Sequence, residues 1–388
     1  MKLLVLTSRF PYPIEKGDKL RAYHQIRVLA QRHEVVLVSL HEGEVSAEAY
    51  QALAAHCARI HLLRYPRWWA WSGALRALMA GRPAQVGYFH HAALHRRVQA
   101  LIAQEAPDHI YCQLLRMAEY VRGGAVPATL DYMDTFSVGM ARRAERSPRW
   151  QRPLLQLESQ RLRRYEAEIF GHFQHHSIIS QQDRALLSFP KAGQITVVPN
   201  GIDLTHFAAQ GEAQPRYEVV FVGNMGYFPN VEAARFLARE IMPLVWERLP
   251  EARLLLAGAR PSAEVQALGR DPRITVSGWV EDIRDAYRDG QLFVAPLRTG
   301  SGQQNKILEA MALGRPCLTT PLVNNAIGAE PGREILLADG AAAFAQQIHT
   351  VLGQPGLRQA IGRAGEAFVR QHFSWEDSTR KLEALWNQ

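Results

Sequence analysis

The sequence predicts an α/β protein made of two doubly wound domains, each built on a parallel sheet. Three observations support this fold class. Short apolar runs alternate with amphipathic helical stretches, the alternation stops near residue 200 and starts again beyond it, and 388 residues are more than one domain usually holds. Strands that are apolar on both faces and separated by helices are typical of a parallel sheet with helices on both sides.

The first domain is expected to span residues 1–200. It opens on an apolar run that is too short for a signal peptide and suits a buried first strand. The helix that follows, at about 19–32, repeats apolar residues near the helical period, as at Leu20, Tyr23 and Ile26. The strands expected in this domain are 2–6, 34–40, 59–63, 109–113, 129–133, 177–180 and 196–199.

A linker is expected at residues 201–215, where a turn cluster leads into a small, polar stretch. The second domain is expected at 216–374, with its main helix at about 231–248. The last helix, 375–388, is expected to cross back onto the first domain. Two such domains could put the carboxyl ends of their strands face to face across a cleft, and ligands of doubly wound sheets bind outside those ends. The strands predicted in the second domain are 218–223, 253–258, 274–279, 292–297, 317–321 and 335–338.

Composition argues against several classes of protein. The net charge of +8 favours anionic partners, but no zinc-finger, RNA-recognition or basic-zipper pattern is present, so nucleic acid is not an expected partner. The cysteines Cys57, Cys112 and Cys317 are far apart, which indicates small buried side chains in a reducing compartment. No histidine cluster has the spacing of a zinc helix motif, and no run of about 18 apolar residues suits a spanning helix. We therefore expect a cytoplasmic protein with no metal and no cofactor.

The segment 296–316 carries the most informative pattern. A buried strand ends in a loop with Gly300 and Gly302, and the loop opens a helix. Free N–H groups and the helix dipole make such a helix start an anion site, and the glycines let a phosphate approach the backbone closely. Lys306 could neutralise a diphosphate, and Glu309, one turn further on, could accept hydrogen bonds from ribose hydroxyls. The alternative is an exposed Lys–Glu pair at a spacing of three residues.

This segment resembles the donor motif of the family 4 glycosyltransferases, which runs Glu, seven residues, Glu, then Ala-Met-Ala-x-Gly-x-Pro. Here Glu309 begins Glu-Ala-Met-Ala-Leu-Gly-Arg-Pro. The resemblance covers nearly the whole chain and looks closest to sugar transferases of bacterial exopolysaccharide systems. The other matching stretches are the hinge 198–203, the loop at 222–223, the base-binding loop 278–282 and the start of the closing helix at 373–375.

The resemblance implies the GT-B fold, in which two Rossmann-like domains face each other. It also implies retaining transfer of a sugar from a nucleotide-diphosphate sugar, UDP- or GDP-linked, without an essential metal. Val280 would offer backbone contacts to the base. The residues at donor-binding positions are Gly17, Gly223, Asn224, Val280, Ser301, Gly302, Asn305, Lys306, Leu308 and Glu309.

The chain departs from the family pattern at the diphosphate. Ser301 stands where the family has its first Glu, and Asn224 and Asn230 stand near the positions of an Arg and a Lys that usually hold the diphosphate. An unneutralised diphosphate would be costly. Lys306, with Arg298 as a second candidate, would therefore have to supply the positive charge.

In the first domain, the family keeps a glycine loop beside the transferred sugar and phosphate, and Gly17 and Asp18 match it. Lys19 and Arg21 are plausible contacts to a phosphate or to the acceptor. The alternative is an exposed charged loop.

Many relatives place a His at the end of the strand near 129–133, where this chain has Asp131 and Asp134. Side chains three apart on a strand point to opposite faces, so we favour Asp134, at the strand's end, as a carboxylate that orients the sugar or activates the acceptor. A helix N-cap is the alternative role. Asp134, Asp18 and Lys306 form the predicted catalytic set.

The segment 63–76 combines three tryptophans with three arginines, which suits the headgroup region of an anionic bilayer. A polyprenyl-linked acceptor would explain it, and the protein would then lie peripherally on the inner face of the cytoplasmic membrane. An aromatic cover over the domain core explains it equally well. The stretch 142–164, with eight arginines, is either a second basic face or a solvated helix. The predicted membrane or acceptor contacts are Arg64, Arg67, Trp68, Trp69 and Trp71.

The predicted function is hexosyltransferase-like transfer to a glycan or lipid-linked acceptor, in exopolysaccharide or cell-surface glycan synthesis. Two alternatives stay open. A nucleotide-sugar epimerase would need acid/base groups that the sequence does not identify. A non-catalytic subunit that binds a nucleotide sugar or a partner is the other alternative, because Ser301 replaces the motif Glu and Asn224 and Asn230 replace the basic pair.

Overall fold

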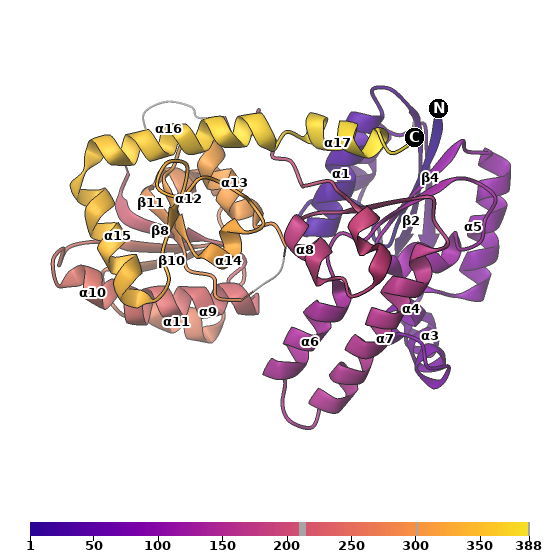
Figure 1. The fold of residues 1–388 in the computed structure, drawn as a ribbon, viewed down its shortest axis with the longest axis horizontal. Helices are drawn as coiled ribbons and strands as arrows, with labels where there is room; N and C mark the ends of the chain where they lie inside the picture. Colours follow the sequence, from indigo (N-terminus) through magenta and orange to yellow (C-terminus); the bar gives the residue numbers. More distant parts are fainter. Residues whose placement is uncertain (209–214, 300–301, 387–388) are drawn as a thin grey trace. The chain divides into compact units, whose positions relative to one another are not determined.

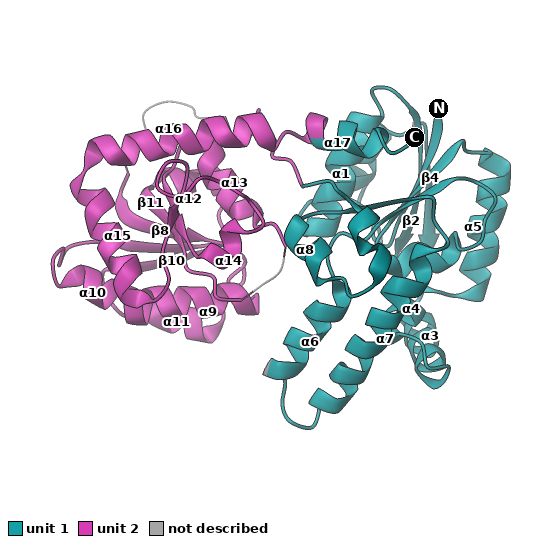
Figure 2. Ribbon diagram, in the orientation of Figure 1, with its two compact units in different colours: residues 1–199, 378–388 teal, residues 200–377 magenta. Residues whose placement is uncertain are grey.

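The computed structural model describes residues 1–208, 215–299 and 302–386, with the backbone alone at Arg146. It divides the chain into two compact units, which are described separately (Figure 2). Unit 1 holds Met1–Pro199 and the C-terminal segment from Ser378, and unit 2 holds Asn200–Asp377. Part of the predicted linker (209–214), the loop residues Gly300 and Ser301, and the last two residues of the predicted final helix lie outside the described residues.

Unit 1 is built on a seven-stranded sheet in the order β3-β2-β1-β4-β5-β6-β7, with all neighbours parallel (Figure 1). The order reverses between β1 and β4, which is the switch point where doubly wound sheets bind ligands. The strands are β1 (Lys2–Thr7), β2 (Glu34–His41), β3 (Arg59–Arg64), β4 (His109–Gln113), β5 (Ala128–Asp131), β6 (His175–Ile178) and β7 (Thr196–Val197). The helices are α1 (Gly17–Leu29), α2 (Ala47–Ala54), α3 (Arg67–Met79), α4 (Ala84–Phe89), α5 (Ala92–Glu105), η1 (Leu115–Tyr120), α6 (Phe136–Arg146), α7 (Arg152–Phe170), α8 (Gln181–Leu186) and η2 (Pro190–Gln194).

Apolar layers on both faces hold the sheet of unit 1. Successive side chains of β1 alternate between them, so Leu4 and Leu6 belong to one layer and Leu3 and Val5 to the other. This explains why β1 reads as a continuous apolar run.

The last helix, α17 (Trp375–Glu383), returns the chain to unit 1. Leu382 and Leu385 are buried in the same layer as Leu3, and the carboxylate of Glu383 pairs with Arg32. The predicted crossing of the C-terminal helix onto the first domain is therefore confirmed.

Unit 2 is built on a six-stranded parallel sheet in the order β10-β9-β8-β11-β12-β13. Its switch point lies between β8 and β11, so it repeats the plan of unit 1. The strands are β8 (Tyr217–Val222), β9 (Leu254–Ala257), β10 (Ile274–Gly278), β11 (Gly290–Ala295), β12 (Cys317–Thr319) and β13 (Leu336–Leu337). The helices are α9 (Phe228–Phe236), the π-helical η3 (Leu237–Ile241), α10 (Met242–Trp246), α11 (Ala263–Leu268), α12 (Ile283–Arg288), α13 (Asn305–Ala312), α14 (Pro321–Asn324), α15 (Ala341–Gly353) and α16 (Pro355–His372).

The predicted class, two Rossmann-like α/β domains with parallel sheets, is confirmed, but some element ends differ. The strand predicted at 129–133 ends at Asp131, because Met133 has a φ of 62°, which an extended strand does not allow. The strand predicted at 177–180 ends at Ile178, because Ser180 caps α8 and accepts a hydrogen bond from the N–H of Asp183 at 3.0 Å.

In the part of the chain that the structure describes, no helix is both long enough and apolar enough to span a bilayer.

Candidate functional site

The candidate residues lie beyond the carboxyl ends of parallel strands in each unit. In unit 2, the Gly223 loop follows β8 and Val280 follows β10. In unit 1, Gly17 begins the helix after β1, and Asp134 follows β5. Ligands of doubly wound sheets bind at this edge, so each unit carries its own group of candidate residues.

Gly223 stands where three backbone segments crowd together. Its N–H donates to the carbonyl of Ala257 at 3.0 Å. A Cβ on Gly223 would lie 2.8 Å from Nδ2 of Asn230. A Cβ on Gly258, which has a φ of +135°, would lie 1.9 Å from the carbonyl oxygen of Gly223. Both glycines therefore allow the loops after β8 and β9 to pack closely.

Lys306 reaches the Gly223 loop from α13. Its Nζ donates a hydrogen bond to Oδ1 of Asn230. The Asn230 amide in turn donates to the carbonyl of Asn224 at 2.9 Å, and Oδ1 of Asn224 accepts the N–H of Gly226 at 3.0 Å. The segment 223–230 contains no basic residue, so Lys306 brings positive charge to a loop that has none of its own.

The environment of the Lys306 ammonium group shifts its pKa. It is half-buried and lies 5.4 Å from the centre of the Phe221 ring. Burial lowers the pKa of Lys306 to about 8, and the carboxylate of Glu309 opposes the shift. An anion bound beside Lys306 would favour its charged form, so the group is suited to a phosphate.

Glu309 is fixed by a tyrosine. Oε2 of Glu309 accepts a hydrogen bond from the hydroxyl of Tyr287 at 2.7 Å, and Tyr287 is fully buried. Burial raises the pKa of Glu309, while Tyr287 and Lys306 hold it down. Within the described residues, Oε1 of Glu309 accepts no hydrogen bond. This oxygen could accept a hydrogen bond from a hydroxyl group, the role toward ribose that the sequence analysis predicted for Glu309.

The loop before α13 is anchored by one side chain. The Gln303 amide accepts the N–H of Asn200 at 3.0 Å and donates to its carbonyl at 2.8 Å. Gly302 has a φ of 77°, which favours glycine. Asn305, the first residue of α13, has a buried Oδ1 that meets no partner among the described residues.

The side chains of two predicted donor residues, Leu308 and Arg298, are already engaged within unit 2. The side chain of Leu308 is fully buried in the core of unit 2, so only its backbone could contact a ligand. Arg298 is tied to Glu232 at 3.5 Å and lies 4.1 Å above the Phe236 ring. Arg298 is therefore a weaker candidate for the diphosphate than Lys306.

Arg260 was missed by the sequence analysis. It follows β9, is exposed and has a φ of 55°. A Cβ on Gly226 would lie 2.9 Å from its carbonyl, so its backbone packs against the Gly223 loop. It forms no ion pair with the described residues. The only signal in the sequence was a basic residue just after a buried strand.

The predicted base-binding loop is held at its end. Asp282 caps α12 by accepting the N–H of Arg284 at 2.9 Å, and its pairing with the Arg284 guanidinium lowers the pKa of Asp282 to about 2. Val280 is half-buried, whereas Trp279 is 71% exposed. Both residues are thus at least partly exposed, just beyond the end of β10.

In unit 1, the start of α1 is open. A Cβ on Gly17 would meet no described atom within 4 Å. Asp18 pairs with Arg9 at 3.1 Å, and its carbonyl accepts the Gln113 amide at 2.9 Å. The packing of unit 1 therefore does not require a glycine at position 17. A ligand that approaches the backbone closely there would require one.

Arg21 was predicted as a phosphate or acceptor contact, and this prediction is wrong. Arg21 is fully buried and pairs with Asp131 at 2.6 Å. Asp131 also accepts hydrogen bonds from Tyr111 at 2.8 Å and Ser177 at 2.9 Å. This pair lies inside unit 1, between α1 and β5, and its two charges satisfy each other as buried charges must. Lys19 instead lines a surface pocket and lies 3.4 Å from the carbonyl of Tyr12.

Asp134 is a separate, under-bonded carboxylate. Its Oδ1 is buried and has no partner within the described residues. Burial raises the pKa of Asp134 to about 7, with Asp183 adding to the shift and Arg116 opposing it. The alternative role as a helix N-cap is wrong. Thr135 occupies the N-cap of α6, and the N–H of Ser137 is bound by Glu166 at 2.9 Å.

Arg116, in η1, is a second residue that the sequence analysis missed. Its guanidinium lies 4.8 Å from the centre of the Phe89 ring and 5.2 Å from that of Phe136. Its Nε is buried without a partner among the described residues. Burial lowers the pKa of Arg116 to about 10, and the positive charge of Arg9 adds to this shift. No local pattern distinguishes it from other arginines, because its setting comes from three separate elements.

The three tryptophans of α3 have different surroundings. One fits an aromatic cover over the domain core, and two are exposed as a membrane contact would require. Trp69 stacks on His91 with ring centres 4.0 Å apart, as part of the domain cover. Trp68 and Trp71 are each 67% exposed. Arg67 is exposed and lies 3.5 Å from Glu42.

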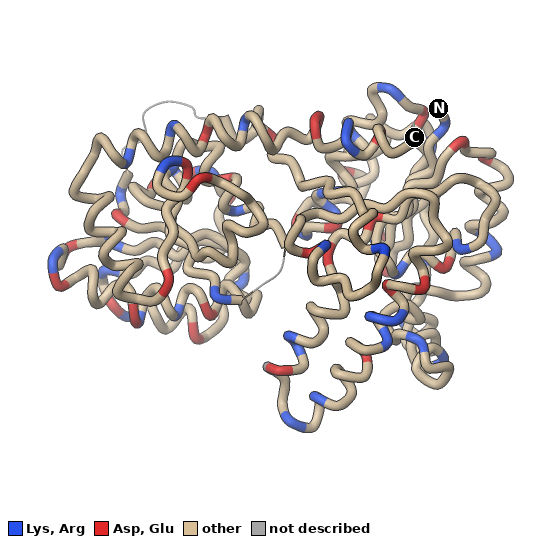
Figure 3. The backbone as a smooth tube through the Cα atoms, viewed as in Figure 1, with Lys and Arg blue, Asp and Glu red and all other residues tan. Residues whose placement is uncertain are grey.

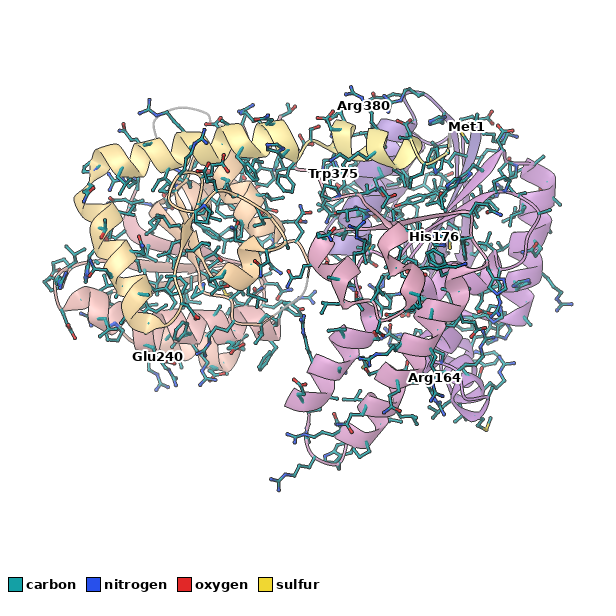
Figure 4. The ribbon with its side chains drawn as sticks, viewed as in Figure 1. Met1, Arg164, His176, Glu240, Trp375 and Arg380 are labelled. Carbon is teal, nitrogen blue, oxygen red and sulfur yellow. The ribbon has the colours of Figure 1, made fainter. Side chains whose placement is uncertain are left out.

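The basic stretch 142–164 forms the α6–α7 hairpin, along which blue Lys and Arg positions recur (Figure 3). Arg164 lies on α7 (Figure 4).

The histidine clusters include core residues, such as His176 (Figure 4). Its ring stacks on Phe170 with ring centres 3.8 Å apart, and its Nε2 lies 2.9 Å from the Phe170 carbonyl. Burial lowers the pKa of His176 to about 4, so the ring is neutral.

Comparison with known proteins agrees with this architecture. Residues 216–354 match the family described as "Glycosyl transferases group 1". A protein of the cps region of Klebsiella pneumoniae, of 44.6 kDa and uncharacterized, is 21% identical over 405 residues, covering 100% of this chain and 99% of its own. The lipopolysaccharide core biosynthesis mannosyltransferase LpcC of Rhizobium leguminosarum bv. viciae is 25% identical over 238 residues, covering 54% of this chain and 66% of its own.

Among solved structures, Alr3699/HepE from Anabaena in complex with UDP has a TM-score of 0.73 at 15% identity, covering 100% of both chains. This likeness shows the GT-B glycosyltransferase fold, as the sequence predicted.

Proposed function

We propose that this chain, which carries a group 1 glycosyl transferase domain at residues 216–354, moves a sugar from a nucleotide-diphosphate sugar to a glycan or lipid-linked acceptor. We propose further that transfer retains the anomeric configuration, needs no metal and serves exopolysaccharide or cell-surface glycan synthesis. UDP in a structure of the same fold and a related mannosyltransferase support the nucleotide-sugar donor, and a related protein of a cps region supports the role in surface-glycan synthesis.

The observation that carries the proposal is the position of Lys306. It joins the start of α13 to the glycine loop after β8 through Asn230, on the carboxyl edge of the sheet. A diphosphate there would meet a charged lysine and the first N–H groups of α13. Exposed Arg260, whose backbone packs against the same loop, would add a second positive charge.

The other donor contacts follow from this placement. Glu309, oriented by Tyr287, would bind ribose hydroxyls through Oε1. The backbone around Val280 would contact the base. Catalysis would then consist of stabilising the departing diphosphate and holding the acceptor hydroxyl near the anomeric carbon.

In unit 1, Asp134 and the Gly17–Asp18 turn would serve the sugar and the acceptor. A carboxylate with a pKa near 7 can accept a proton from a hydroxyl at neutral pH. The open backbone at Gly17 would let a sugar or phosphate approach closely.

The same unit would lie against the inner face of the cytoplasmic membrane. Exposed Trp68 and Trp71 suit the interface, and the arginines of the α6–α7 hairpin suit anionic lipid. Sedimentation with vesicles of phosphatidylglycerol, against vesicles of phosphatidylcholine, tests this. Loss of sedimentation in a Trp68→Ser, Trp71→Ser variant is expected, and unchanged sedimentation would refute the role of α3.

A thermal-shift screen against UDP, GDP, ADP, CDP and their common sugars tests the donor assignment. A ligand at about 100 times its dissociation constant adds roughly 2.7 kcal/mol to the stability of the folded protein. We expect one nucleotide series to raise the melting temperature, also in the presence of EDTA, and this shift to be lost in Lys306→Ala. If no nucleotide or nucleotide sugar raises the melting temperature, the donor site is assigned wrongly.

A non-catalytic role is the second candidate, since Ser301 replaces the first motif Glu. Nucleotide-sugar binding without any transfer to a lipid extract would favour it. Turnover of the nucleotide sugar without an acceptor, to an epimer, would favour the epimerase instead.

A further inference from the structure

An apolar groove in unit 1 has no role in the donor assignment. It has a volume of about 720 Å³ and is bounded by α3, α4, α6 and α7. Trp71, Leu75 and Leu154 are more than half exposed there. Exposed apolar side chains gathered along one groove indicate a binding site. The main apolar lining is Trp71, Leu75, Tyr88, Met140, Leu154 and Leu155.

The walls of this groove are tied together by polar contacts. The Glu158 carboxylate, on α7, accepts the N–H groups of Ala84 and Gln85 at the start of α4, at 2.8 and 2.9 Å. Arg161, also on α7, donates to the carbonyl of Leu78 on α3 at 2.9 Å. The α6–α7 hairpin is therefore bonded to α3 and α4, and the groove is built into unit 1.

Three arginines line the groove: Arg9, Arg116 and Arg143. Arg9 also pairs with Asp18 at 3.1 Å, so a bound phosphate would share its guanidinium with that carboxylate. Arg116 forms no ion pair with the described residues, and its Nε has no hydrogen-bond partner among them. The aromatic rings of Phe89 and Phe136 hold its guanidinium in place. A half-buried guanidinium with an unused donor is suited to an anion, above all a phosphate.

The groove adjoins a second, more polar pocket. This second pocket, of about 400 Å³, shares Arg9 and Glu42 with it and is lined by Lys16, Lys19 and His41. Glu42 is occupied by the hydroxyls of Tyr65 and Tyr88, at 3.0 and 3.1 Å. A ligand that passes from one pocket to the other would be apolar, then anionic, then polar.

We propose that the acceptor is a lipid phosphate, whose hydrocarbon chain lies in the α3–α4/α6–α7 groove and whose phosphate binds Arg116 and Arg9. The second pocket then receives the polar group beyond the phosphate, next to Asp18 and the start of α1. This inference rests on the proposed function and narrows its acceptor to a lipid-linked one. The charge complementarity of Arg116 and the apolar lining select this occupant over a free glycan, which offers neither an alkyl chain nor a fixed phosphate.

Equilibrium dialysis of the full chain with radiolabelled geranylgeranyl phosphate tests the proposal. Geranylgeraniol supplies the chain without the charge, and inorganic phosphate supplies the charge without the chain. We expect geranylgeranyl phosphate to bind at least about tenfold more tightly than either one, because a charge-assisted hydrogen bond and the buried chain both contribute.

Variants on α3 provide a matched pair. Leu75 and Met79 are both exposed apolar residues of this helix, but only Leu75 lines the groove. Leu75→Glu should lower the affinity for geranylgeranyl phosphate about tenfold or more, and Met79→Glu should leave it within about twofold. Arg116→Gln should weaken binding of geranylgeranyl phosphate but not of geranylgeraniol.

Three outcomes would overturn the proposal: no binding of geranylgeranyl phosphate, equal effects of Leu75→Glu and Met79→Glu, or inorganic phosphate binding as tightly as the lipid. The thermal shift with nucleotides, measured on the same samples, separates the two hypotheses. Absent lipid binding with an intact nucleotide shift refutes the groove alone, whereas an absent nucleotide shift refutes the proposed function.

Discussion

Nζ of Lys306 donates a hydrogen bond to Oδ1 of Asn230, which lies 76 residues earlier in the chain. The bond joins the first turn of α13, the helix after β11, to the first turn of α9, the helix after β8, and these two strands are neighbours at the switch point of unit 2. A chain that lacks basic residues in its glycine loop thus acquires a cation there from another element.

Replacing Lys306 by Ala should weaken nucleotide-diphosphate binding by about tenfold or more, because a charge-assisted hydrogen bond contributes about 1.5–3 kcal/mol. Isothermal titration with the nucleotide found in the screen measures the change. Arg298→Ala is the matched control, since Arg298 already pairs with Glu232. Its effect should be smaller, and equal losses in both variants would contradict the special position of Lys306.

Nucleotide affinity should depend on the protonation of Lys306. The pKa of the free lysine is about 8, and a bound diphosphate raises it. Above pH 8 the free protein must therefore take up a proton to bind, so the affinity falls as pH rises, by up to about tenfold per pH unit. Lys306→Arg keeps its charge throughout, and should show a flatter profile between pH 7 and 9. Parallel profiles for the two proteins would rule out this role of Lys306.

Substitution by Ala should reduce sugar transfer at Gly17 and protein stability at Gly258. At Gly17 the added methyl group meets no described atom within 4 Å, so stability should be unchanged while sugar transfer falls. At Gly258 the methyl group would lie 1.9 Å from the Gly223 carbonyl at a φ of +135°, so unfolding by urea should occur at a lower concentration. Full activity of Gly17→Ala would remove Gly17 from the substrate site.

Asp134→Asn should stabilise the protein at pH 8 and abolish most of the transfer activity. The pKa of Asp134 in the folded protein is about 7, above the ordinary value of 3.8, so the folded state binds this proton more tightly than the unfolded state. Between pH 4 and 7 the wild type therefore loses stability from Asp134 as pH rises, and the variant lacks this contribution. The stability advantage of Asn should be at least about 1 kcal/mol at pH 8 and vanish near pH 4.

Thermal melts at pH 4, 6 and 8 measure this difference. Asp183 and Glu166, whose pKa values are also raised by burial, remain in both proteins, so the comparison isolates Asp134. A pH-independent difference would mean that Asp134 is ionised in the folded protein.

The order of elements and the parallel sheets follow from the sequence alone, because local periodicity determines them. Apolar runs such as 3–6 and 219–222 can be buried on both faces only in a covered parallel sheet. The segment 296–316 could also be interpreted locally. Its helix start, Lys306 and Glu309 are adjacent in sequence, and helix geometry places the two side chains on one face.

Tertiary structure decided which charges are available to a ligand. Arg21 and Asp131 look like site residues in the sequence, but the fold buries them against each other across 110 residues. Arg116 looks like any other arginine, but the packing of α4, α6 and η1 leaves its Nε without a partner among the described residues. Whether a charge is paired depends on contacts between residues far apart in the chain, and local sequence patterns do not encode such contacts.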